Sequence, residues 1–93
     1  MVSPPLDAVA PTLEPRLRAV LDLERTWWKL GVPKERAIRE HLGLSTTRYH
    51  QLLTKAIDMP QALAYDPMLV RRLRRLRETR RRKRFEGRLG LRS

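Results

Sequence analysis

The chain has 93 residues, a net charge of +11 and no cysteine. This length suits one small domain, and the lack of cysteine excludes disulfides and cysteine-containing zinc or redox sites. No apolar run approaches the roughly 18–20 residues of a membrane-spanning helix, and the N-terminus lacks the pattern of a secretory signal, so we expect a cytoplasmic protein.

The positive charge is concentrated at one end of the chain. Residues 71–93 contain twelve Lys and Arg and two Glu, whereas residues 1–70 contain nine Lys and Arg and eight Asp and Glu. The first part is thus almost neutral, and the second carries nearly all of the net charge. Such a basic block indicates a polyanionic partner, which can be DNA, RNA or an anionic membrane surface.

The N-terminal part of the chain predicts an arm followed by a helix. Residues 1–15 include four prolines and little periodicity, so we expect a disordered arm there. Apolar residues at helical spacing predict a helix over Arg16–Leu30, which Gly31 ends. Trp27 and Trp28 point about 100° apart on a helix, so we expect one to pack in the core and the other to lie at its rim. The rim tryptophan is a candidate contact for a partner protein or, through its indole N–H, for a phosphate.

Two further apolar-patterned segments flank a short break. The first, Lys34–Leu42, is followed by Gly43, which suits a backbone position with positive φ. The second, Ser45–Ile57, opens on a serine that can cap the helix by accepting a hydrogen bond from an amide of the first turn. The pattern predicts a helix-turn-helix, a motif that in DNA-binding proteins places its second helix in the major groove. Similar helical pairs also occur in bundles that bind no DNA.

The C-terminal part predicts one more long helix. Gln61–Tyr65 is expected to form a short helical turn, and Asp66 then caps a helix that begins at Pro67. Apolar residues at i, i+4 and i+7, which are Leu69, Leu73 and Leu76, allow this helix to lie on the core for about two turns. Beyond them, Arg77–Arg84 is expected to be helical where a partner neutralises its charge.

These elements together predict an all-α fold. We expect a helical domain of about four helices over residues 16–77, with the arm over residues 1–15 and an Arg-rich tail over residues 78–93. No stretch shows the alternating apolar pattern of a strand.

The polar side of the second helix of the pair holds candidate contacts to DNA. It consists of Ser45, Thr46, Thr47, Arg48, His50, Gln51 and Lys55. Hydroxyl groups and backbone amides at a helix N-terminus bind phosphate, whereas Gln pairs with adenine and Arg with guanine in the major groove. An ordinary solvated helix face is the alternative.

The basic run is the second candidate site. It comprises Arg71, Arg72, Arg74, Arg75, Arg77, Arg80, Arg81, Arg82, Lys83 and Arg84. Guanidinium groups bind phosphate oxygens bidentately and can enter narrow minor grooves. Because like charges at this density repel one another without a screening partner, we expect the run to follow a phosphate backbone. The composition fits DNA and RNA alike.

Nothing in the sequence indicates catalysis. His41 and His50 lie on different predicted helices and lack carboxylate co-ligands, so we expect no metal site. The chain has no convincing nucleophile with a neighbouring base and no Gly-rich phosphate loop. We therefore expect no enzyme, no cofactor and no small-molecule substrate.

Three segments resemble an actinobacterial family of small proteins of unknown function. They are LDLERTWWK (Leu21–Lys29), KERAIREHLGLSTTRYHQLL (Lys34–Leu53) and DPMLVRRLRRLR (Asp66–Arg77). The residues that match the family pattern are Trp27, Trp28, Gly43, Ser45, Arg48, Tyr49, Asp66 and Pro67. The resemblance implies a helix-turn-helix protein of the bacterial cytoplasm without a settled role, and it makes Arg48 the first candidate for a functional contact.

The leading hypothesis is a DNA-binding protein that acts in transcription regulation or nucleoid organisation. A domain of this size reads few base pairs, so a specific regulator would bind as a dimer or beside another DNA-bound protein. One alternative is an accessory protein that docks on RNA polymerase like a detached module of a sigma factor. Another is an RNA-binding protein that uses chiefly the Arg-rich tail.

Overall fold

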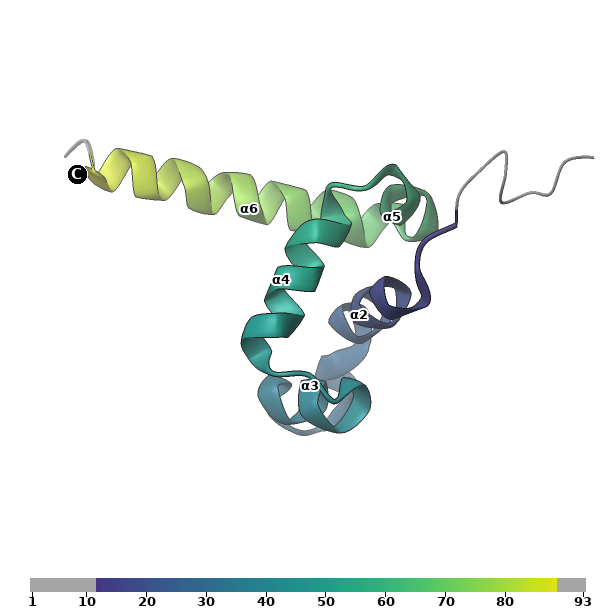
Figure 1. Ribbon diagram of the computed structural model, residues 1–93. Helices are drawn as coiled ribbons and strands as arrows, with labels where there is room; N and C mark the ends of the chain where they lie inside the picture. Colours follow the sequence, from purple (N-terminus) through teal and green to yellow (C-terminus); the bar gives the residue numbers. More distant parts are fainter. Residues whose placement is uncertain (1–11, 89–93) are drawn as a thin grey trace, which may run out of the picture.

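The computed structural model describes residues 12–88, and all regular structure in this part of the chain is helical (Figure 1). Its elements are α2 (Pro15–Thr26), the 3₁₀ helix η1 (Trp27–Leu30), α3 (Lys34–Leu42), α4 (Thr46–Ile57), α5 (Pro60–Tyr65) and α6 (Pro67–Arg88). The predicted all-α fold is confirmed. In Figure 1, α6 lies across one end of the other helices and projects well beyond them.

The last residues of the predicted arm, 12–15, belong to the helical domain. Residues 1–11 of the predicted arm lie outside the described residues, but Leu13 is 3% exposed and belongs to the core. Its carbonyl oxygen accepts a hydrogen bond from Arg18 at 3.1 Å. Pro15 is the first residue of α2, a position where the missing amide of proline costs nothing. The helix therefore starts at the proline that was expected to end the arm.

The first helix is shorter than predicted. Instead of one α-helix to Leu30, α2 ends at Thr26, whose hydroxyl donates to the Asp22 carbonyl at 2.8 Å, and η1 follows. Such tightening into 3₁₀ geometry is common at helix ends, and Gly31 at φ +70° terminates the segment. Trp27 is partly buried against the core and Trp28 is 63% exposed, which is the division that their spacing predicts.

A helix, a turn and a second helix follow in the predicted order. Gly43 adopts φ +66° after α3, and the hydroxyl oxygen of Ser45 accepts a hydrogen bond from the amide of Arg48 at 3.1 Å. Figure 1 looks nearly along the axis of α3 while α4 runs across the view, so the two helices cross steeply. The buried side of α4 consists of Tyr49, Leu52, Leu53, Ala56 and Ile57.

One carboxylate joins three helical segments beneath α4. Glu24 of α2 accepts hydrogen bonds from the Tyr49 hydroxyl at 2.7 Å and from the Lys34 ammonium group at 3.2 Å, and the Lys34 nitrogen lies 2.9 Å from the other carboxylate oxygen. The Lys34 nitrogen also lies 5.6 Å from the ring centroid of Tyr49 and 5.7 Å from that of Trp27. Burial, followed by the adjacent Glu24, raises the pKa of Tyr49 far above its usual range, so its hydroxyl stays protonated and donates. We call Glu24, Lys34 and Tyr49 the Glu24 cluster.

Two arginines of the basic run attach α6 to the end of α4. The Arg74 side chain donates to the Ile57 carbonyl at 2.6 Å, and Arg77 binds both carboxylate oxygens of Asp58 at 2.8 and 3.1 Å. A cation is favourable there because the C-terminus of a helix carries partial negative charge. The hydrogen bond from Arg77 holds the pKa of Asp58 below its ordinary value.

Helix α6 runs unbroken from the domain into the basic run. The Asp66 carboxylate accepts a hydrogen bond from the Leu69 amide at 3.3 Å, as predicted for a cap. Leu69 and Val70 are buried, but Leu76, predicted to lie on the core, is 44% exposed. The expectation that residues beyond Leu76 need a partner to become helical is not met, since α6 continues to Arg88. Arginine is itself a strong helix former, and these residues point in all directions around the axis.

The Glu24 cluster predicts a specific stability defect. Tyr49→Phe removes the donor to a shielded carboxylate, so the free energy of unfolding should fall by about 1–2 kcal/mol. Urea unfolding followed by circular dichroism measures this change. Tyr65→Phe is the matched control, because the Tyr65 hydroxyl makes a similar 2.8 Å bond to Asp22 in an exposed position. Tyr65→Phe should lower the free energy of unfolding by less than about 0.5 kcal/mol. Equal losses would contradict a special role for the cluster.

The Asp58–Arg77 pair predicts a pH-dependent contribution. Because the pKa of Asp58 is lowered in the fold, the pair stabilises above the unfolded-state pKa, and this contribution is lost as the pH falls through the folded-state value. Asp58→Asn should therefore lower the free energy of unfolding by less than about 1 kcal/mol at pH 7, because the Asp58 side chain is 60% exposed. The difference from the wild type should disappear as the pH falls through the folded-state pKa of Asp58, which lies below its ordinary value. A difference that persists in acid, or one matched by the exposed-carboxylate control Glu35→Gln, would refute this assignment.

Candidate functional site

The polar side of α4 is open to solvent along its whole length. The exposed residues are Ser45, Thr46, Thr47, Arg48, His50, Gln51, Thr54 and Lys55, which include every contact predicted for this helix. The 12-residue helix measures about 18 Å and contains no acidic residue. It therefore presents a polar surface that does not repel an anion.

Helical geometry orders these side chains across the surface of α4. Thr47, Gln51 and Thr54 recur at i, i+4 and i+7 and lie opposite the buried side. A shallow hollow runs over these three residues and His50. The Arg48 guanidinium lies 3.4 Å from the Gln51 side-chain oxygen.

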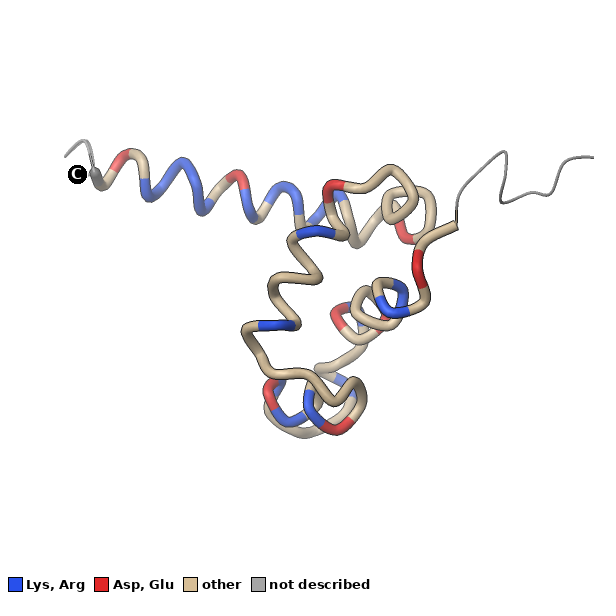
Figure 2. Tube along the Cα trace, in the orientation of Figure 1, with Lys and Arg blue, Asp and Glu red and all other residues tan. Residues whose placement is uncertain are grey.

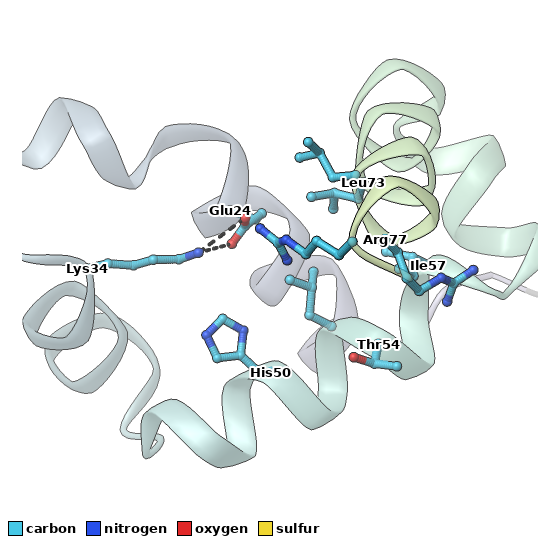
Figure 3. A pocket seen from close by; sticks show the side chains of 10 residues that line it. Glu24, Lys34, His50, Thr54, Ile57, Leu73 and Arg77 are labelled. Carbon is cyan, nitrogen blue, oxygen red and sulfur yellow. Dashed lines mark hydrogen bonds and ion pairs between the residues drawn. The ribbon is translucent and has the colours of Figure 1, made fainter. Parts of the chain in front are cut away.

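The polar side of α4 continues into a cleft beneath α6. The cleft has a volume of about 180 Å³. It is lined by Glu24, Lys34, His50, Leu53, Thr54, Ile57, Leu73, Leu76, Arg77 and Arg80 (Figure 3). Figure 3 shows the paired Glu24 and Lys34 on one side, His50 along α4, and Leu73 and Arg77 coming from α6. His50 and Thr54 border both hollows, so the polar side of α4 lies directly beside the cleft that Leu73, Leu76, Arg77 and Arg80 of α6 line.

The arginines of α6 fall into three groups. Arg74 and Arg77 bind the end of α4 and are partly buried, so they are not free to bind phosphate as predicted. Arg80, Arg81 and Arg84, here called the inner arginines, continue the side of α6 that faces the core, because successive residues turn by 100°. Arg71, Arg72 and Arg75, here called the outer arginines, lie on the opposite side. Both named groups are exposed.

The two remaining predicted basic contacts are also exposed. Arg82 lies in line with the outer arginines, and Lys83 lies at the edge between the two sides. Figure 2 shows basic residues along the full projecting length of α6, interrupted by Glu78 and Glu86. Glu78 lies 3.5 Å from Arg81, and both side chains are about 60% exposed, so this pair neutralises little charge.

The two tryptophans differ in what they can offer a partner. The Trp28 indole N–H donates to the Arg25 carbonyl at 3.0 Å, which uses the group that was expected to reach a phosphate. Its ring is exposed, with the Lys29 ammonium 5.3 Å from the centroid. Trp27 is packed against the core. Of the predicted pair, Trp28 thus presents an aromatic surface to solvent.

The described residues show neither a metal centre nor a membrane anchor. Between residues 12 and 88, no three potential metal ligands among His, Asp and Glu come together. No helix in the same range is both long and apolar enough to cross a membrane.

The comparisons with known proteins give a family. A family described as "Protein of unknown function (DUF3263)" matches residues 12–85. This range contains all three segments on which the resemblance in the sequence rests. No curated protein matches the chain, and no solved structure does so. Because the family match covers most of the 93 residues, the chain belongs to the DUF3263 family.

Proposed function

We propose that this protein binds duplex DNA, with the first turns of α4 in the major groove and the inner arginines on the phosphate backbone beside it. One observation carries the proposal. The acid-free polar side of α4 and Arg80 of α6 border two neighbouring hollows, which share His50 and Thr54. A surface suited to base edges and a surface suited to phosphates can therefore contact one duplex at the same time.

The size and chemistry of α4 suit a major groove. An α-helix with its side chains is about 10–12 Å across and the groove is about 12 Å wide, so one helix fits. Gln51 and Arg48 supply the side chains that pair with adenine and guanine, and the Thr47 methyl group can contact thymine. The exposed N-terminus of α4 around Ser45 and Thr46 adds a favourable dipole for a backbone phosphate.

The inner arginines supply the sequence-independent part of binding. Arg80 and Arg84 are one helical turn apart, and Arg81 lies beside them on the same side of α6. Because α6 is already helical, these groups can bind phosphates without the entropy loss of ordering a flexible tail. The Arg74 and Arg77 contacts to α4 fix the direction in which α6 projects relative to the bound groove.

The reach of the site suggests its biological setting. A single helix of this length contacts few base pairs, so selective binding needs a second copy or a neighbouring protein on the DNA. The exposed Trp28 ring is the candidate contact for such a partner. These properties suit transcription regulation or nucleoid organisation in a bacterial cell.

Substitutions on the two surfaces should have different signatures in fluorescence-anisotropy titrations with a panel of duplexes. Gln51→Ala and Arg48→Ala should each lower the affinity for the preferred duplex by about 5- to 150-fold, because each removes a side chain that discriminates between bases. The differences in affinity among duplex sequences should become smaller. The double variant Arg80→Ala/Arg84→Ala should lower the affinity for all duplexes by the same factor. It should also reduce the steepness of the plot of log affinity against log salt concentration by about 2, because two phosphate contacts are lost.

Arg16→Ala is the control for these titrations, because it removes an exposed charge from the start of α2. It should change affinity for every duplex by less than about threefold, as expected for a charge outside the interface. Affinities that respond equally to the control and to the α4 substitutions would refute the assignment of α4. Equal or tighter binding of single-stranded RNA would favour the RNA-binding alternative.

A further inference from the structure

The outer arginines form a second basic surface that the proposed DNA site does not use. Arg71, Arg72 and Arg75 are all exposed. At 100° per residue, their mean direction lies roughly 160° around the axis of α6 from that of the core-facing residues Leu69, Val70 and Leu73. The outer arginines thus lie on the opposite side of α6 from the inner arginines and from the cleft that α4 borders.

A fourth arginine, from a different helix, joins this surface. Arg25 of α2 lines the same hollow as Arg72 and Arg75, together with Asp66 and Met68. The Arg25–Asp66 distance of 3.6 Å is long for an ion pair, and the Arg25 side chain is 61% exposed. Three exposed arginines from two helices, Arg25, Arg72 and Arg75, therefore lie around one partly shielded carboxylate.

The position of α6 keeps the two basic surfaces apart. Helix α6 is held on α4 by the 2.6 Å bond from Arg74 to Ile57 and by the bidentate Arg77–Asp58 pair. A duplex bound to α4 and the inner arginines does not contact the outer arginines, because α6, about 10–12 Å thick, stands between them. A separate polyanion can therefore bind to the outer arginines without displacing the duplex on α4 and the inner arginines.

We propose that the outer arginines bind a second DNA duplex, so that one molecule bridges two duplexes. The inference rests on the proposed function for the first duplex. The distance across α6 exceeds the Debye length of about 8 Å at physiological salt, so the repulsion between the two duplexes is largely screened. Each duplex still gains its own contacts with arginines.

Duplex DNA fits the outer surface better than other polyanions do. Arg71 and Arg75 are about 6 Å apart along a rigid helix, and Arg82 lies on the same side about 16 Å from Arg71, a span over which a DNA strand presents several phosphates. Glu78 lies between Arg75 and Arg82 on this side, so the phosphate contacts fall to the arginines on either side of it. No aromatic side chain lines the hollow at Arg72 and Arg75. Single-stranded RNA is usually held by stacking on aromatic rings, for which this surface has no platform.

A bridging assay on the full chain tests the inference with charge-matched variants. One biotinylated duplex is fixed to beads, protein is added, and capture of a second, fluorescent duplex is measured beside the affinity for a single duplex. Arg71→Ala/Arg72→Ala/Arg75→Ala should reduce capture at least about tenfold while changing single-duplex affinity less than about threefold. Arg80→Ala/Arg81→Ala/Arg84→Ala removes the same charge and should weaken single-duplex binding at least about tenfold. Helix content by circular dichroism confirms that both variants fold.

The possible outcomes separate this inference from the proposed function. Wild-type protein that binds a single duplex but captures no second one overturns bridging and leaves the proposed function standing. Undiminished capture by Arg71→Ala/Arg72→Ala/Arg75→Ala also overturns the bridging inference, because bridging would then come from pairs of protein molecules. Capture of single-stranded RNA or of phosphatidylserine vesicles in place of the second duplex assigns the surface to another polyanion and overturns the inference. Failure of the wild type to bind any duplex refutes the proposed function itself.

Discussion

The structure depends on one shielded carboxylate. Glu24 accepts hydrogen bonds from Tyr49 and Lys34, and these three residues come from α2, α4 and α3. A carboxylate in a partly buried position is stable only when its oxygens are bound, and donors from two different helices meet that need here. Tyr49 lies on the buried side of α4 beside Leu52, Leu53, Ala56 and Ile57, so this interaction anchors the side that apolar burial turns inward. The polar surface of α4 is a consequence of how its opposite side is anchored.

The second constraint is the junction between α4 and α6. Arg74 and Arg77 bind the carbonyl and the carboxylate at the C-terminal end of α4, where the helix dipole also favours positive charge. The buried part of α6 is short, since Leu69 and Val70 are buried but Leu76 is already half-exposed. The two arginine contacts add polar attachment where the apolar contact ends. The projecting part of α6 therefore continues in a direction that the domain determines.

This arrangement divides the positive charge into surfaces with separate geometry. One basic surface lies beside the polar side of α4, and the other, widened by Arg25, lies on the opposite side of α6. A flexible tail with the same composition would bring all its charges to a single polyanion. A rigid helix cannot do this, because its side chains point in fixed directions around the axis. The proposals for DNA binding and for bridging both follow from that rigidity.

The sequence by itself determined the helical segments, the turn and the side of each helix that is buried. These features are local: Gly43 and Ser45 define a turn, Asp66 and Pro67 start a helix, and apolar spacing identifies buried positions. Which arginines are available and that Leu13 belongs to the core depend on contacts between segments far apart in the chain. The continuation of α6 to Arg88 is a local property that the charge argument from the sequence underestimated, because arginine is a strong helix former. Nothing in the run of arginines distinguishes Arg74 and Arg77 from their neighbours. Their partners, Ile57 and Asp58, lie 17 and 19 residues earlier in the chain. The use of an arginine depends on what folding places opposite it, and local spacing carries no information about that.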